Sequence, residues 1–305
     1  MTYASGGLIE ATDYNGFVAS VNAIWGTGSS DSGYGQTTTL STVTAASSTV
    51  TATQWSDLIA RINSLRNHQT AGAPGSGITQ PSTGNTITYL SSLSTQISTA
   101  TSNKLLNAGD GTAASGGSGT ASASNATGWT TTRSLEISYT FLSANQMRYF
   151  FNTGGFFDYN ATSSVLTGNT KSTDWDALTD AFGTTRIRSQ SSSKEGGSGT
   201  LNTNNTNAGF YDLTATDTLV LRQYSTTAAG GYTSNYISSF ARLNVIHASS
   251  PTVIYLKIVF QDDAADGLND TVSGTATLNT AGYASGVTYI ANTWGTFTGA
   301  VTVAG

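Results

Sequence analysis

The chain has no cysteine, only two histidines and only three prolines among its 305 residues. The absence of cysteine excludes disulfides, thiolate metal sites and cysteine nucleophiles, and it indicates a protein made in a reducing cytosol. Two histidines leave little scope for imidazole catalysis, and three prolines in a glycine-rich chain argue against a proline-rich linker protein. We therefore expect the fold to be held together by packing alone.

Charged residues are also sparse. The chain carries 12 Lys and Arg against 17 Asp and Glu, a net charge of -5, and this balance disfavours binding along nucleic-acid phosphates. The nearest approach to a basic patch is Arg186, Arg188 and Lys194, which we interpret as a solvated strand edge and loop. No run approaches the roughly 20 apolar residues that span a bilayer, and the start of the sequence lacks the pattern of a signal peptide. We expect no nucleic-acid partner, no membrane insertion and no signal-dependent secretion.

The residues that are abundant indicate a folded protein rich in β-structure. Hydrophobic residues make up 37% of the chain and aromatic residues 10%, which is not a disordered composition. Thr, Ser, Tyr, Val and Gly in bulk favour strands joined by turns. The length exceeds that of one typical domain, so we expect two parts.

The first part, residues 1–107, is predicted to be a helical region, and the near-heptad spacing of its third helix allows self-association. Apolar residues recur at three- and four-residue spacing, with Thr12 and Thr53 as N-caps. His68 ends the second helix, where a partly cationic imidazole would interact favourably with the helix dipole. The predicted helices cover 12–25, 53–67 and a segment from after Gly84 to about Leu106.

A Gly/Ser-rich stretch at 108–128 is predicted to be a flexible linker, and residues 129–305 a β domain. The apolar run VIYLKIVF, Val253–Phe260, is predicted to be a central strand, and TFTGAVTV near the end a terminal strand. The fold class is therefore α+β, with a small helical part followed by a mainly antiparallel β-sandwich-like domain that holds one short helix at 173–182. Further strands are expected near 184–188, 208–213, 217–225, 236–247, 252–261, 272–278 and 296–303.

The stretch NQMRYFFNTGGFFDY, from Asn145, is the densest aromatic segment. Its Gly-Gly pair predicts a β-hairpin in which Phe150 faces Phe157, and aromatic side chains then occupy both faces. Two apolar faces favour burial in a core or at a subunit interface, and we predict Phe150, Phe157 and Tyr159 as interface residues. A ligand-stacking platform with one exposed aromatic face is the alternative.

No segment has the spacing of a catalytic, cofactor-binding or phosphate-binding motif, so we expect no enzyme activity and no cofactor. His68 and His247 have no nucleophile and acid arranged around them. The acidic stretch QDDAADGLND is a weak candidate for a Ca²⁺ site, with a solvated hairpin loop as the alternative. Its carboxylates are Asp262, Asp263, Asp266 and Asp270. A carbohydrate-binding site would use tyrosines near glycine-rich loops, namely Tyr232, Tyr236, Tyr283 and Tyr289.

Several segments together resemble virion structural proteins of tailed bacteriophages, of the tail-fibre-like kind. They are ASGGLIEATDYNGFVASVNAIWGTGSSDSGYGQ, VTATQWSDLIARINSLRNHQ, QMRYFFNTGGFF, KSTDWDALTDAFGT, DTVSGTATLN and NTWGTFTGAVTV. The resemblance implies a non-enzymatic subunit, assembled in the host cytoplasm into the virion, whose helical part docks it to other virion proteins and whose β domain projects.

Copies of the chain would associate, with three-fold symmetry by analogy with fibres. A tail fibre, collar or baseplate-peripheral component is the leading interpretation. The alternatives are a capsid decoration or neck protein, or a carbohydrate-binding module that recognises a host-surface glycan. The resemblance transfers no site residue to this chain.

Overall fold

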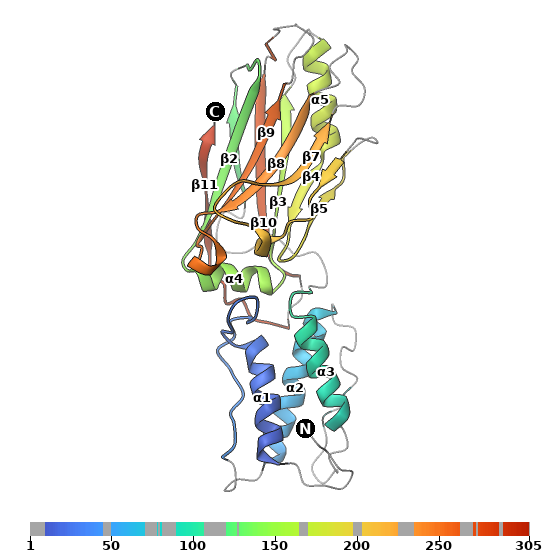
Figure 1. Cartoon of the computed structure of the whole chain (residues 1–305), viewed down its shortest axis with the longest axis vertical. Helices are drawn as coiled ribbons and strands as arrows, with labels where there is room; N and C mark the ends of the chain where they lie inside the picture. The colour runs from blue at the N-terminus through green and yellow to red at the C-terminus, as the bar shows by residue number, and fades with distance from the viewer. Residues whose placement is uncertain are drawn as a thin grey trace. The chain divides into compact units, whose positions relative to one another are not determined.

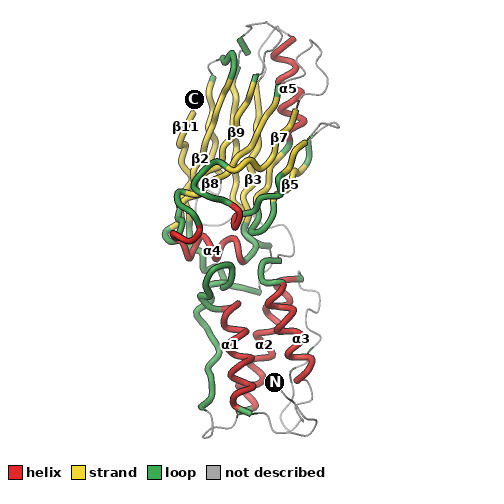
Figure 2. Tube along the Cα trace, in the orientation of Figure 1, coloured by secondary structure: helices red, strands yellow, loops and turns green. Residues whose placement is uncertain are grey.

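The chain folds into two compact units, a helical unit and a β unit. The helical unit comprises Met1–Thr112, Arg148–Gly154 and Ser285–Trp294, and the β unit comprises the remainder. The chain therefore passes between the units five times, whereas the sequence predicted one division at a linker. The computed structural model in Figures 1 and 2 describes residues 10–44, 50–70, 78, 80, 90–106, 120–126, 128–164, 170–197, 203–224, 235–262, 271–272, 274–286 and 289–304.

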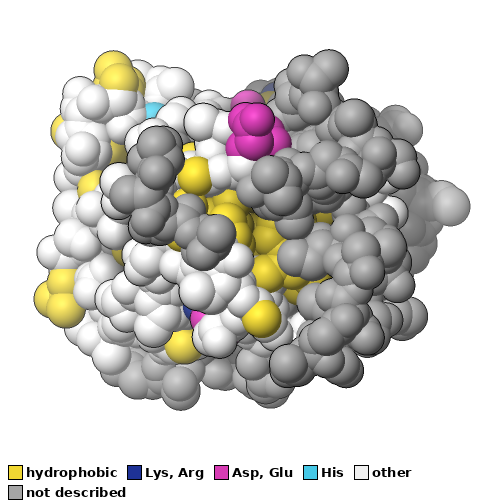
Figure 3. All heavy atoms as spheres, turned by 90° about the horizontal axis from the view of Figure 1, so that it is seen from below, with side chains coloured by type: hydrophobic (Ala, Val, Ile, Leu, Met, Phe, Trp, Pro, Cys, Tyr) yellow, Lys and Arg dark blue, Asp and Glu magenta, His cyan; other side chains and the backbone are white. Residues whose placement is uncertain are grey.

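Within the described part of the helical unit, the three predicted helices are present and lie side by side (Figure 1). They are α1 (Ala11–Trp25), α2 (Ala52–Gln69) and α3 (Leu90–Ser102). Their apolar stripes meet in one core, as the sequence periodicity predicted. Its largest fully buried side chains are Tyr14, Phe17, Tyr34 and Trp55. In the view from below, hydrophobic side chains gather at the centre, and a group of acidic side chains lies beside them (Figure 3).

The predicted N-caps are each wrong by two residues. Helix α1 follows Glu10, whose side chain makes no capping hydrogen bond, so Thr12 already lies inside the helix. Helix α2 is capped by Thr51, because Thr51 Oγ1 accepts a hydrogen bond from the Gln54 amide and the Gln54 side chain accepts one from the Thr51 amide. This reciprocal capping box places the true start of α2 ahead of Thr53.

Helices α1 and α2 run in the same direction. Near their starts, the ring centroids of Tyr14 and Trp55 are 6.4 Å apart. Farther along both helices, the guanidinium carbon of Arg61 lies 3.9 Å from the ring centroid of Trp25. Parallel neighbours need a connection that returns along the bundle, and part of this connection forms a wall of the groove described below.

The β unit contains two antiparallel sheets in its described part, which confirms the α+β class with a β-sandwich-like region. The five-stranded sheet has the order β1-β10-β3-β4-β5, and the six-stranded sheet has the order β11-β2-β9-β8-β7-β6. The strands are β1 (Thr120–Asn125), β2 (Thr132–Phe141), β3 (Phe156–Ser164), β4 (Thr184–Ile187), β5 (Ser192–Glu195), β6 (Thr203–Asn205), β7 (Thr218–Tyr224), β8 (Tyr236–Leu243), β9 (Val253–Gln261), β10 (Thr275–Tyr283) and β11 (Phe297–Ala304).

Aromatic side chains fill the space between the two sheets. Tyr139 of β2 lies 4.6 Å from Phe157 of β3, measured between ring centroids. The short predicted helix is α5 (Thr170–Phe182), and its Trp175 packs edge-on against Trp129, with ring centroids 5.6 Å apart. The predicted central strand is confirmed, because β9 lies between β2 and β8.

The predicted aromatic hairpin is wrong. Residues Ala144–Asn152 form helix α4, the chain turns at Gly154 with a φ of 98°, and only the second half of the stretch is extended, as β3. Ser143 Oγ accepts a hydrogen bond from the Gln146 amide over 3.2 Å, which is an N-cap contact. The Ser-x-x-Gln pattern at 143–146 was therefore a helix-start signal that the aromatic density concealed.

The linker boundary and several strand predictions also need correction. Thr120–Asn125, within the predicted linker, pairs along its whole length with β10, because an edge strand of small residues needs only its backbone to join a sheet. The segment predicted as a strand at 208–213 contains a 3₁₀ turn at Phe210–Asp212. The strand predicted at 236–247 ends at Leu243, so His247 lies beyond it in a second 3₁₀ turn.

Candidate functional site

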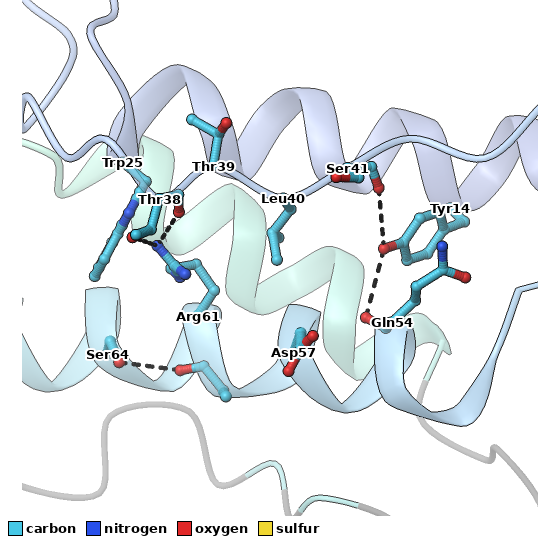
Figure 4. Close-up of a pocket in the computed structure, with 11 residues that line it drawn as sticks. Tyr14, Trp25, Thr38, Thr39, Leu40, Ser41, Gln54, Asp57, Arg61 and Ser64 are labelled. Atoms are coloured by element: carbon cyan, nitrogen blue, oxygen red, sulfur yellow. Dashed lines mark hydrogen bonds between the residues drawn. The ribbon is translucent and has the colours of Figure 1, made fainter.

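A groove of about 560 Å³ runs along the helical unit between α1, α2 and the extended segment 38–41 (Figure 4). Trp25 and Arg61 lie at one end of the groove, and Tyr14 and Gln54 lie at the other. Asp57 lies between them on α2. No sequence pattern predicts this groove, because its walls come from two helices and the connection between them.

Two asparagines of α1 hold the extended segment in place. Asn22 Nδ2 donates to the Leu40 carbonyl over 2.8 Å, and Asn22 Oδ1 accepts from the Leu40 amide over 2.9 Å. Asn15 makes the same pair of hydrogen bonds to Val43, both of 2.8 Å. Each side-chain amide thus satisfies one backbone donor and one backbone acceptor, as a neighbouring β-strand would. We call residues 38–43 the strap.

Replacing Asn22 with aspartate is expected to loosen the strap. A carboxylate keeps the acceptor but loses the Nδ2 donor, and it places a negative oxygen against the Leu40 carbonyl. We expect a loss of about 1–3 kcal/mol in the free energy of unfolding of the helical unit. Amide hydrogen exchange of Leu40 should accelerate more than that of Val43, which Asn15 still holds. Equal acceleration at both amides would contradict independent clamping.

The groove is lined mainly by polar side chains. Arg61 Nη1 donates to the Thr38 carbonyl over 2.6 Å, and burial lowers the pKa of Arg61, while the charge of Asp57 opposes that shift. An arginine stays protonated at neutral pH despite such a shift. Burial, and then the charge of Asp57, raises the pKa of Tyr14, so its hydroxyl stays protonated as well. The groove therefore presents one cation, one carboxylate and several hydroxyl groups.

The loop between α1 and the strap, with the sequence GTGSSDSGYGQ, binds side chains of α4. Arg148 Nη2 donates to the Thr27 carbonyl over 2.6 Å, and Nη1 donates to the Ser32 carbonyl over 2.7 Å. Asn152 Nδ2 donates to the Gly33 carbonyl over 2.9 Å. The loop offers three backbone carbonyls to two side chains of α4, which are more than a hundred residues away in the chain.

A segment near the end of the chain completes the same unit. Gln36 Nε2 donates to the Ala291 carbonyl over 2.8 Å, and Thr293 Oγ1 donates to the Tyr34 carbonyl over 2.8 Å. Tyr34 is fully buried, and its hydroxyl donates to a backbone carbonyl of the segment that follows α3. We call residues 26–36, with the parts of 148–154 and 285–294 that contact them, the closure cluster. Sequence reasoning missed it, because each of its contacts joins distant segments.

His68 belongs to the core beside the closure cluster, and its predicted role is wrong. Its ring is 1% exposed and packs edge-on against Tyr34, with centroids 5.4 Å apart. Burial lowers the pKa of His68 to about 4, and a polar contact with the backbone of Thr153 offsets this only in part. The imidazole is therefore neutral at physiological pH and cannot interact with the helix dipole as a cation.

The buried His68 predicts a pH-dependent stability of the helical unit. Its pKa is about 4 in the folded chain against an ordinary value of 6.5, so the unfolded chain binds the proton first as the pH falls. Stability is therefore complete above pH 6.5, and roughly 3 kcal/mol is lost as the pH falls to about 4. His68→Phe should keep the packing against Tyr34 and remove most of this loss. An equal loss in His68→Phe and wild type, measured by chemical unfolding at both pH values, would exclude the explanation.

His247 has no catalytic arrangement around it among the described residues. Its ring is half-buried, stacks on Tyr211 with centroids 5.2 Å apart, and Nε2 contacts the Phe210 carbonyl. Burial lowers the pKa of His247, and the Phe210 carbonyl and the charge of Asp212 oppose the shift. The His247 side chain therefore packs against aromatic neighbours at the turn in which it lies.

The predicted cation site falls mostly outside the described residues. Asp263, Asp266 and Asp270 lie there, and only Asp262 can be placed. Asp262 is 2% exposed, and its amide donates to the Thr131 carbonyl over 2.6 Å. Within the described part of the chain, no cluster of three or more potential metal ligands is present.

The predicted interface residues lie inside the chain. Phe150 and Phe157 are 0% exposed and Tyr159 is 1% exposed, so these side chains have no free surface to offer to another subunit. Phe150 contributes to the helical unit, where its ring lies 6.2 Å from that of Trp294. Phe157 and Tyr159 contribute to the core of the β unit. Of the two predicted environments, the core is the one observed.

Three of the four tyrosines predicted to stack on sugars can be placed. Tyr232 lies outside the described residues, Tyr236 is half-buried on the six-stranded sheet, and Tyr283 stacks on Phe156 of the five-stranded sheet with ring centroids 5.0 Å apart. Tyr289 is 40% exposed and belongs to the helical unit.

The predicted basic patch is partly buried and paired. Arg186 makes two hydrogen bonds to Asp158, of 2.7 and 2.8 Å, and its side chain is only 12% exposed. Lys194 Nζ donates to Gln223 over 2.7 Å. Arg188 follows Arg186 at the end of β4. The interpretation as a solvated strand edge is therefore wrong for Arg186.

The outer face of the six-stranded sheet carries a chain of ion pairs. Arg242 contacts Glu136 at 2.8 Å and Asp217 at 3.1 Å, and Lys257 contacts Asp217 at 2.8 Å. Burial raises the pKa of Glu136, and Arg242 lowers it in opposition. Both carboxylates are held by cations, so the arrangement is that of a structural network rather than of an acid and a base facing a substrate.

Comparison with known proteins gave no relative: no protein-family model, curated protein or solved structure matches the chain. Among the described helices, none has the length and hydrophobicity needed to cross a membrane.

Proposed function

We propose that this chain is a non-enzymatic structural subunit of a tailed-phage virion, a tail fibre, collar or baseplate-peripheral component that assembles as a homo-oligomer. The helical unit docks the subunit to other virion proteins, and the β unit projects. The proposal starts from the resemblance of the quoted segments to virion proteins, because no comparison supplies a relative.

The closure cluster is the observation that supports this proposal most. Four of the quoted segments supply it or the core beside it, although they are far apart in the sequence. The loop after α1 receives Arg148 and Asn152 of QMRYFFNTGGFF and Thr293 of NTWGTFTGAVTV, and His68 of the α2 segment packs on Tyr34. The four segments that carry the resemblance therefore contact one another in a single cluster of the helical unit.

The groove gives the helical unit a surface that can receive a neighbouring protein. It is open, polar and bounded by a strap that is fixed by side-chain hydrogen bonds, so its shape is set before a partner arrives. This arrangement suits a docking role.

A glycan-binding role of the β unit is the second candidate. On the outer face of the six-stranded sheet, the guanidinium carbon of Arg222 lies 4.4 Å from the ring centroid of Tyr236 and 6.0 Å from that of Tyr224. Arginine and tyrosine together can bond and stack on a sugar. A silent glycan array, with host adsorption unchanged in Tyr236→Ala, would remove this candidate.

The decisive experiment locates the protein on particles. Purified particles of the phage that encodes the chain should contain it in several copies by quantitative peptide mass spectrometry. Antibody labelling of intact particles should mark the tail, collar or baseplate region. Labelling of the head would favour the capsid-decoration alternative, and labelling of the neck would favour the neck-protein alternative. Absence of the chain from washed particles would overturn the proposal.

A further inference from the structure

The groove of the helical unit presents a fixed cation at one end. Arg61 Nη1 donates to the Thr38 carbonyl over 2.6 Å and to Thr38 Oγ1 over 3.2 Å, and the guanidinium carbon lies 3.9 Å from the ring centroid of Trp25. Both hydrogen bonds use Nη1, whereas a guanidinium also carries donors on Nε and Nη2. The Arg61 side chain is therefore held in position by one edge and by its stacked face, and its other edge can bind an anionic group.

The opposite end of the groove presents hydrogen-bond acceptors. The Tyr14 hydroxyl lies 3.3 Å from the Ser41 carbonyl and 3.5 Å from the Gln54 carbonyl (Figure 4). A hydroxyl has one proton, so it satisfies only one of these carbonyls at a time. Between the two ends, the exposed Asp57 side chain points from α2 toward the strap. Carbonyl and carboxylate oxygens together suit a cationic donor.

The strap shows that an extended chain fits beside a helix of this unit. Asn15 and Asn22, which hold the strap, are two turns of α1 apart, about 10.5 Å at 1.5 Å per residue. Their partners Val43 and Leu40 are three residues apart, about 10 Å in an extended chain. Because the two spacings match, an extended backbone stays in step with a helix over this length.

The charged residues of α2 have a spacing that an extended chain can also match. Asp57 and Arg61 are four residues apart on α2 and both line the groove, about 6 Å apart along the helix axis. In an extended chain, neighbouring side chains on the same side are two residues apart, about 6.5 Å. A basic and an acidic side chain with this spacing can therefore reach Asp57 and Arg61 together.

We propose that the groove binds an extended segment of a partner protein in which one residue separates a basic residue from an acidic residue. The basic side chain binds Asp57 and the acceptors beside Tyr14, and the acidic side chain binds the outer edge of the Arg61 guanidinium. The charges of the groove and of the segment are thus complementary.

The dimensions of the groove fit a segment of this length. The strap carbonyls that Arg61 and Tyr14 contact belong to Thr38 and Ser41, which are three residues apart, about 10 Å in an extended chain. A sugar is a less suitable ligand, because Trp25 and Tyr14 are only 7% and 1% exposed and their rings are not presented for stacking.

This inference rests on the proposed docking role of the helical unit, and it names the chemistry of the partner. Its test uses the purified chain and short peptides, whereas the virion role is tested on particles. A chain that is present on particles but does not bind the peptides overturns this inference alone. A chain that binds the peptides but is absent from particles overturns the virion role alone.

Four fluorescein-labelled peptides, titrated with the chain and followed by fluorescence anisotropy, provide the first test. The matching peptide is Gly-Ser-Lys-Thr-Glu-Ser-Gly. Gly-Ser-Thr-Lys-Glu-Ser-Gly has the same composition, but its two charged side chains lie on opposite sides of an extended chain. The other two peptides carry Lys-Thr-Lys or Glu-Thr-Glu at the centre. The wild-type chain should bind the matching peptide about three to ten times more tightly than each of the others.

Reversing one charge of the groove should change this preference. Asp57→Lys gives the groove two cations, so the Glu-Thr-Glu peptide should become the tightest ligand. Asp180→Lys is the matched control, because Asp180 is an exposed aspartate on α5 of the β unit and its substitution changes the net charge equally. This control should keep the wild-type preference. If circular dichroism shows that Asp57→Lys does not fold, Asp57→Asn decides, since it should abolish the preference for Lys-Thr-Glu over Glu-Thr-Glu.

The indole N–H signal of Trp25 in a ¹⁵N NMR spectrum locates the bound peptide. This signal is assigned by its loss in Trp25→Phe, and it should shift with the matching peptide but not with maltose at the same concentration. Equal affinity for all four peptides would overturn the proposal, as would a preference that Asp57→Lys leaves unchanged. A shift with maltose and none with the peptide would identify a sugar site and overturn it as well.

Discussion

Replacing Gly33 with alanine is expected to lower the free energy of unfolding of the helical unit by about 2–4 kcal/mol. Gly33 has a φ of 102°, in the region that favours glycine. A Cβ there would lie 2.3 Å from the Thr27 carbonyl oxygen, which is backbone and cannot rotate away. The Thr27 carbonyl accepts a hydrogen bond from Arg148, and the Gly33 carbonyl accepts one from Asn152. The substitution should therefore disturb both anchors of α4 together.

Gly196→Ala separates the strain of the backbone angle from this clash. Gly196 also has a positive φ, of 66°, but a Cβ there would meet no atom within 4 Å. Its substitution should cost about 1–2 kcal/mol, the cost of the left-handed conformation alone. Chemical unfolding, followed by tryptophan fluorescence, measures both. If Gly33→Ala costs no more than Gly196→Ala, the loop has room to move, and the closure cluster is looser than its contacts indicate.

Replacing Phe157 with alanine is expected to destabilise the β unit by about 3–5 kcal/mol. The ring is 0% exposed and sits in an aromatic cluster, 4.6 Å from Tyr139 and 5.4 Å from Phe297 between centroids. Its removal leaves a cavity where two sheets meet and where the surrounding strands cannot collapse. Because the side chain is buried within the chain, the loss should appear in dilute monomer as well as in any assembly.

Phe240→Ala is the matched control for this prediction. Phe240 has the same side chain but is half-buried on the outer face of the six-stranded sheet, so its truncation should cost about 1 kcal/mol. Thermal unfolding compared at two protein concentrations checks both variants. A Phe157→Ala chain that is fully stable as a monomer but fails to associate would contradict the core assignment and restore the interface prediction.

The elements with strong periodicity were predictable from the sequence. Helices α1 and α2 were found because their apolar residues repeat every three or four positions, a signal that one helix carries by itself. Val253–Phe260 was found for the same kind of reason, since a run of β-branched and aromatic residues indicates a central strand. In both cases the local pattern and the final packing agree.

The aromatic stretch misled because its most prominent signal was not the decisive one. Thr153 and Gly154 do form a turn, but it joins a helix to a strand. The N-cap contact between Ser143 and Gln146 explains why the first half of the stretch is helical. Thr120–Asn125 consists of small residues and was therefore predicted to be part of a linker, whereas it forms strand β1. Strand β1 forms because β10 pairs with it. A local sequence of six small residues carries no signal for pairing with a strand more than 150 residues away.

The candidate site was the least predictable part. The groove depends on Asn15 and Asn22, two polar residues of α1 whose role appears only when the strap lies beside them. The closure cluster depends on Arg148 and on residues near 291, which no local pattern links to the loop after α1. Sequence reasoning located the helices that build the site, but not the connections between them.

The contacts of the closure cluster join segments that are far apart in the sequence, and this determines when the helical unit can finish folding during translation. Gln36 leaves the ribosome early, but its partner Ala291 is made only near the end of translation. Helices α1 and α2 can form and meet before then, while their loop still lacks the segment that closes it. The helical unit, which contains the start of the chain, is therefore completed only near the end of synthesis. A chain cut short anywhere before residue 291 would therefore lack a finished helical unit.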